Sequence, residues 1–148
     1  MDVYPGVVLG LALFNLGRLT NLLSARPMGL SALALIILTS VGWRLAVDVA
    51  YDIGEPIPFV VAGATGAMFV SLGLLVSWKV TVNPVFFIVS ITVSGAVGGF
   101  IFRFINAALG IGTNILWPLL LFMEWQLILV TGLYLVMRGA RRIEVQEY

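Results

Sequence analysis

Two long stretches without a charged residue constrain this chain more than any other feature of its sequence. They cover residues 56–78 and 80–102, and each is 23 residues long. A helix of about 20 apolar residues crosses the hydrocarbon core of a bilayer, which is about 30 Å thick. The composition agrees, since 61% of the 148 residues are hydrophobic and only 10% are charged, whereas soluble domains carry about 25% charged residues. The sequence therefore predicts an integral membrane protein.

The predicted fold is all-α, because a helix satisfies its own backbone hydrogen bonds in lipid. It is a polytopic helical bundle that forms a single transmembrane domain (1–148). The five predicted transmembrane helices lie at residues 4–23, 28–51, 57–78, 84–105 and 114–137, followed by a short tail at 138–148. The first is the least apolar, since Asn15, Arg18 and Asn21 fall in its second half. The alternative is four spans with a re-entrant or interfacial first helix.

The orientation follows from the basic residues, because loops rich in Lys and Arg stay on the cytoplasmic side. With the C-terminus inside, the outer ends of the helices hold only Arg44 and Arg103. The inner ends hold Arg26, Lys79, Arg138, Arg141 and Arg142. We therefore expect an outer N-terminus and a cytoplasmic or interior C-terminus, in a cell membrane or a viral membrane.

Small residues recur at helical spacing in the third and fourth segments. The third carries Gly63, Ala67 and Ser71, and the fourth carries Ser90, Ser94, Gly95, Gly98 and Gly99. Such stripes let helix backbones approach closely, which matters because lipid tails provide no hydrophobic drive for association. We expect these helix-packing residues to join the two helices of one chain or, alternatively, to form an interface between subunits.

Glu124 lies near the middle of the fifth segment, where an ionised carboxylate costs about 2.5–3.5 kcal/mol. At 1.5 Å per residue, Asn15 and Arg18 of the first segment reach a similar depth. The hypothesis is a buried polar cluster of Asn15, Arg18, Glu124 and Gln126, in which Arg18 keeps Glu124 ionised through a charge-assisted hydrogen bond. This cluster is interpreted as a structural clamp. The alternatives are a proton or ion-coupling site, or a neutral Glu124 that faces a subunit interface or a headgroup defect.

An outer acidic cluster of Asp48, Asp52 and Glu55 follows the second segment. Carboxylate oxygens are the ligands that Ca²⁺ and Mg²⁺ prefer. The spacing is not that of a calcium loop, however, and Arg44 offsets one of the charges. The sequence therefore predicts a solvated helix end and no metal site.

The absence of cysteine and histidine removes thiol nucleophiles, thiolate metal sites and the commonest general base. The net charge is only +1, which is not the strongly basic charge expected of a protein that binds nucleic acid. No nucleotide-binding or catalytic motif is present. We expect a protein that is not an enzyme and that uses no cofactor. Its partners are the lipid bilayer and other membrane subunits or copies of itself.

The predicted function is that of a structural or accessory subunit of a larger membrane assembly, such as a multisubunit membrane complex or a viral envelope. The alternative is a small homo-oligomeric channel, holin-like pore or transporter that uses Glu124. A pore needs polar atoms along a shared axis at several depths. Polar residues are sparse in the third and fourth segments, which argues against a wide aqueous pore.

Overall fold

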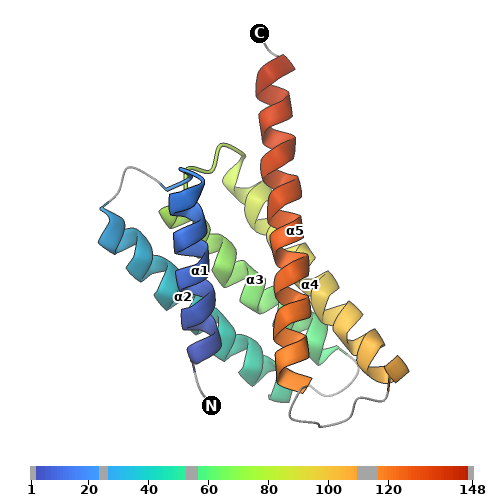
Figure 1. The fold of residues 1–148 in the computed structure, drawn as a ribbon. Helices are drawn as coiled ribbons and strands as arrows, with labels where there is room; N and C mark the ends of the chain where they lie inside the picture. Colours follow the sequence, from blue (N-terminus) through green and yellow to red (C-terminus); the bar gives the residue numbers. More distant parts are fainter. Residues whose placement is uncertain (1–2, 24–26, 53–56, 110–116, 147–148) are drawn as a thin grey trace.

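The computed structural model describes residues 3–23, 27–52, 57–109 and 117–146. These residues form five helices, which confirms the predicted all-α fold. The helices are α1 (Tyr4–Leu19), α2 (Met28–Asp52), α3 (Pro58–Ser77), α4 (Pro84–Leu109) and α5 (Trp117–Gln146). They run alternately up and down, so that α1 begins at one end of the bundle and α5 ends at the other (Figure 1).

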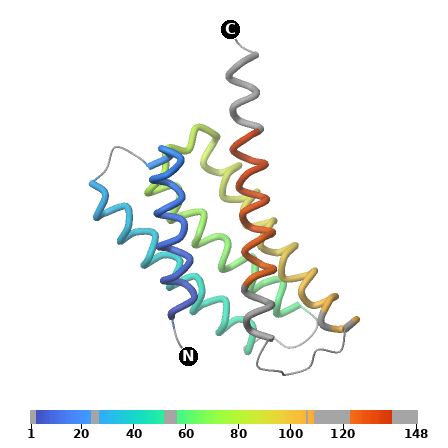
Figure 2. The backbone as a smooth tube through the Cα atoms, in the orientation of Figure 1, coloured from blue at the N-terminus to red at the C-terminus, as the bar shows by residue number. Residues whose placement is uncertain are grey.

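The helices form two layers. α3 lies between α2 and α4, and α1 packs on α2 while α5 packs on α4. Figures 1 and 2 show α1 and α5 in front of the layer that α2, α3 and α4 form. The core between the layers is apolar, and its largest fully buried hydrophobic side chains are Leu35, Val70, Leu74, Phe87, Ile91 and Leu129.

Among the described residues, three helices are long and apolar enough to cross a membrane, at Met28–Tyr51, Pro58–Ser77 and Pro84–Ile105. α1 is a shorter apolar helix of 16 residues, which corresponds to about 24 Å. Large hydrophobic side chains also cover the outside of the bundle. On α4 they follow one face at helical spacing, through Val85, Val89, Val93, Val97, Phe100 and Phe104. An exterior of this kind is unusual for a protein in water, and it is consistent with a membrane location.

α1 ends four residues earlier than the sequence predicts, at Leu19. Asn21 adopts a left-handed conformation, with φ of 56°. The N–H of Leu22 donates to the carbonyl of Gly17 (2.9 Å), and the N–H of Asn21 donates to the carbonyl of Arg18 (3.3 Å). This pair of bonds is a Schellman motif, which satisfies the last carbonyls of a helix and turns the chain away from its axis.

The segment after α1 then meets the end of α3. The N–H of Lys79 donates to the carbonyl of Leu22 (2.6 Å), and Leu23 forms an antiparallel bridge with Trp78. These contacts fix the C-terminal end of α1 beside the C-terminal end of α3.

Asn83 caps the start of α4, and the helix extends further than predicted. The Asn83 side-chain carbonyl accepts hydrogen bonds from the N–H groups of Val85 (2.9 Å) and Phe86 (3.2 Å). Pro84 occupies the first helical position, where its missing N–H costs nothing. α4 continues to Leu109 and α5 to Gln146, because no proline interrupts either sequence beyond the predicted ends.

Candidate functional site

Two glycines bring the backbones of α3 and α4 into contact. A Cβ atom added at Gly63 would overlap the carbonyl of Gly95, and one added at Gly95 would overlap both the carbonyl of Gly63 and the Cβ of Ala67. One turn along, a Cβ at Gly99 would overlap the carbonyl of Phe59. The structure thus places Gly63, Ala67, Gly95 and Gly99 at a contact within one chain.

The other small residues of α4 face α5. A Cβ at Gly98 would lie 3.1 Å from Cδ1 of Trp125, and one at Gly132 would overlap the Ser94 hydroxyl. The Ser94 hydroxyl donates to the carbonyl of Ser90 (2.9 Å). α4 therefore has two small-residue faces, one for α3 and one for α5.

Ser71, the last of the predicted packing residues, is buried on α3, and its hydroxyl donates to the carbonyl of Met68 (2.7 Å).

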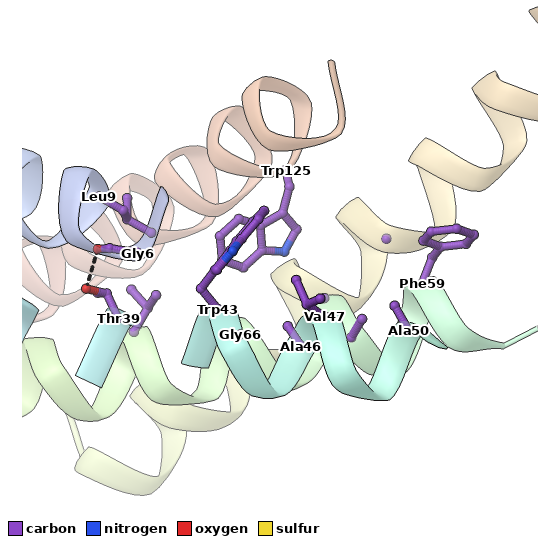
Figure 3. A pocket seen from close by; sticks show the side chains of 14 residues that line it. Gly6, Leu9, Thr39, Trp43, Ala46, Val47, Ala50, Phe59, Gly66 and Trp125 are labelled. Carbon is purple, nitrogen blue, oxygen red and sulfur yellow. Dashed lines mark hydrogen bonds between the residues drawn. The ribbon is translucent and has the colours of Figure 1, made fainter. Parts of the chain in front are cut away.

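A third close contact joins α1 and α2. A Cβ at Gly10 would lie 2.7 Å from the Thr39 hydroxyl and 2.8 Å from Cα of Ile36. The Thr39 side chain is only 2% exposed, and its hydroxyl donates to the carbonyl of Gly6 across the helix interface (2.7 Å), as Figure 3 shows. Thr39 was not among the residues predicted from the sequence. The sequence feature that could have indicated this contact is a hydroxyl group within an otherwise apolar span, opposite a pair of glycines.

The structure does not bring Arg18 and Glu124 together. Both carboxylate oxygens of Glu124 are buried, and they have no hydrogen-bond partner among the residues that the structure describes. The side chains of Arg18 and Asn15 are exposed, and that of Gln126 is half-buried. None of these three side chains hydrogen-bonds Glu124.

α1 and α5 start at the same end of the bundle, at Tyr4 and Trp117. At 1.5 Å per residue, Arg18 lies about 21 Å along α1 but Glu124 only about 10 Å along α5. The depths predicted from the sequence, about 21 Å for Arg18 and about 15 Å for Glu124, assume a fifth helix that begins at residue 114, which lies outside the described residues.

The outer acidic cluster is described only at Asp48. Its carboxylate accepts a hydrogen bond from Nε of Arg44 (3.0 Å), and both side chains are exposed. The side chain of Asp52 and the whole of Glu55 lie outside the described residues. Within the described part of the chain, no group of three His, Cys, Asp or Glu side chains is arranged to hold a metal ion.

All five helices contribute to a central pocket of about 70 Å³ (Figure 3). Its walls are almost entirely apolar, and they include the glycines Gly6, Gly63, Gly66 and Gly99. Trp125 packs between the helices here, with its side chain 8% exposed and its indole nitrogen without a hydrogen-bond partner. The pocket could hold a small apolar group, but it offers no set of groups for chemistry.

A larger groove of about 540 Å³ lies between α1 and α5, and we call it the α1–α5 groove. Leu16, Thr20, Leu22 and Trp78 line one side of it. The α5 side consists of Val130, Leu133, Tyr134, Met137 and Arg138. The groove is thus apolar along most of its length and carries a cation and a phenol at one end.

A comparison with known proteins finds no matching family model, no matching curated protein and no matching solved structure.

Proposed function

We propose that this chain is a non-enzymatic integral membrane protein that serves as a structural or accessory subunit of a larger membrane assembly. A multisubunit membrane complex and a viral envelope are both assemblies of this kind. In this proposal all five helices cross the membrane, with the N-terminus outside and the C-terminus inside. One observation carries the proposal: among the described residues, the buried hydroxyls of Thr39, Ser71 and Ser77 donate to backbone carbonyls, and the central pocket has apolar walls.

The hydroxyls of Thr39 and Ser77 support this interpretation most directly. Thr39 donates to Gly6 of α1, and Ser77 donates to the carbonyl of Ser31 on α2 (3.0 Å). Both bonds join two helices, so these polar atoms hold the bundle together. A pore would need them to face a shared aqueous axis, whereas the pocket at the centre of this bundle has apolar walls.

The apolar outer surface of the bundle supports the proposal that a partner contacts this protein within the bilayer. Exposed side chains such as Leu33, Ile37 and Val41 on α2 form an apolar face. Outside the spans, the described chain consists only of short segments. A partner would therefore contact this protein mainly through helix faces at membrane depth.

The mass of the extracted protein tests this proposal. The chain is purified in a mild detergent from its native membrane, and separately from a host in which it is expressed alone, and both samples are measured by native mass spectrometry. An accessory subunit is expected to leave its native membrane in fixed stoichiometry with other membrane proteins. A homo-oligomer of the same mass from both sources would contradict the proposal.

A second candidate is a small homo-oligomeric channel, holin-like pore or transporter that uses Glu124. Its support is the pair of buried carboxylate oxygens without a hydrogen-bond partner. Intramembrane carboxylates often mark ion or proton paths. In this candidate function a second copy of the chain, an ion or water would complete the environment of Glu124.

A further inference from the structure

The α1–α5 groove combines apolar walls with a cation and a phenol at one end. Its volume of about 540 Å³ falls in the range of ligand pockets, about 300–1,000 Å³. Leu16, Val130, Leu133 and Met137 provide apolar walls. Arg138 and Tyr134 lie together at the end where α5 passes beyond α1.

Arg138 is positioned over the aromatic ring of Tyr134. Its guanidinium carbon lies 5.9 Å from the ring centroid, and Nη1 is 3.4 Å from the phenol oxygen. A cation at this distance is attracted by the electrons of the ring. A guanidinium has five N–H donors, and Arg138 has no ion pair with any described residue. Donors of Arg138 therefore remain for an anion at the mouth of the groove.

The indole of Trp78 lines the groove beside α1. Its side chain is only 3% exposed, and the N–H has no hydrogen-bond partner. The indole nitrogen is the atom nearest to where a Cβ of Gly17 would lie, at 2.5 Å. The N–H edge of the ring thus points toward the α1 wall. Trp78 therefore contributes an apolar part of the wall, because its N–H is buried against Gly17 of α1.

The basic side chains at this end of the bundle favour a negatively charged ligand. Among the side chains that the structure describes here, Arg18, Lys79 and Arg138 are basic and none is acidic. By the orientation proposed above, this end lies in the cytoplasmic leaflet, where anionic lipids give a negative surface potential. A glycerophospholipid combines an acyl chain, ester carbonyls that accept hydrogen bonds, and a phosphate.

We propose that the α1–α5 groove binds one anionic phospholipid, with an acyl chain along its apolar walls and the phosphate at Arg138. This site does not depend on whether the chain is a scaffold or a channel. It makes the lipid a bound component of the bundle, joining α1 to α5.

The test compares two lipids that share the same acyl chains. The full chain is purified in detergent and incubated with equal amounts of dioleoyl phosphatidylglycerol and dioleoyl phosphatidylcholine, and the bound lipid is counted by native mass spectrometry. A basic residue near an anionic lipid contributes about 1 kcal/mol, or about fivefold in affinity. The wild-type chain is expected to retain about five times more phosphatidylglycerol.

Two variants and a control locate the site. Arg138→Gln is expected to bring the preference close to one. Arg18→Gln removes a charge at the same end of the bundle but outside the groove, and it is expected to keep the preference. Val130→Trp places a large ring in the groove at an exposed position, and it is expected to lower retention of both lipids at least fivefold.

Three outcomes would overturn the site. The first is equal retention of the two lipids by the wild-type chain. The second is loss of the preference in Arg18→Gln as complete as in Arg138→Gln, which would indicate general surface charge. The third is full lipid retention by Val130→Trp. Arg138 and Val130 are both exposed, so these variants are expected to fold, and circular dichroism would verify it.

Discussion

The hydroxyl of Thr39 on α2 donates a 2.7 Å hydrogen bond to the backbone carbonyl of Gly6 on α1. The bond forms because Gly6 and Gly10 have no side chain to separate the two helices. The same hydroxyl lies 2.6 Å from the carbonyl of Leu35 in its own helix. One side chain thus links the least apolar predicted span to the rest of the bundle.

Replacement of Thr39 by the isosteric valine is expected to destabilise the bundle by about 0.6–1.5 kcal/mol, since hydrogen bonds between membrane helices contribute about that amount. The control is Thr131→Val, because the Thr131 hydroxyl is exposed and bonds only to Leu127 of its own helix. Unfolding in mixed detergent micelles would measure both. Equal losses in the two variants would show that the link to α1 has no stabilising role.

Gly95→Ala is expected to destabilise the bundle by about 1–3 kcal/mol, the usual cost of overpacking. The added methyl would overlap the carbonyl of Gly63, and a backbone carbonyl cannot rotate away, so α3 and α4 would have to separate. Gly29→Ala is the matched control, because nothing lies within 4 Å of a Cβ at that position. The control is expected to be neutral or slightly stabilising, and equal unfolding midpoints for the two variants would contradict the close contact.

Glu124→Leu is expected to stabilise the isolated chain by about 1–3 kcal/mol, because it removes a buried polar group that has no partner. Glu124→Gln keeps the size and the polarity, so its effect is expected to be smaller. Unfolding of the purified single chain would measure both changes. A loss of stability in Glu124→Leu would indicate that the carboxylate has a partner within the chain.

Single-cysteine labelling is expected to place the two ends of α3 on opposite sides of the membrane. The chain has no native cysteine, so each variant carries one thiol. Tyr51→Cys lies near the start of α3, and Lys79→Cys follows its end, and both side chains are exposed. An impermeant maleimide added to intact cells is expected to label Tyr51→Cys at once and Lys79→Cys only after permeabilisation. Labelling of both from one side would show that α3 does not cross.

The helices could be predicted from the sequence because hydrophobic runs mark them directly. Their ends were harder to predict. Asn21 ends α1 through a left-handed turn, a conformation that asparagine adopts more readily than most residues but does not require. The far end of α5 extends beyond the prediction, because a change from apolar to charged residues marks the edge of a membrane and not the end of a helix.

Contacts across helices were predicted less well than the helices themselves. The small residues of α3 and α4 indicate close approach, and the structure adds that α4 uses separate faces for α3 and α5. The pairing of Arg18 with Glu124 required the relative register of two helices at opposite ends of the chain. No pattern within either helix specifies this register.

The most direct measurement is ion flux in liposomes that contain only this chain, with Glu124→Gln as the matched variant. A structural subunit whose interior hydroxyls hold helices together is expected to leave the vesicles as impermeable as protein-free vesicles, and the variant is expected to behave the same way. Substantial flux through the wild-type chain that disappears in Glu124→Gln would contradict the scaffold function and establish a conducting path.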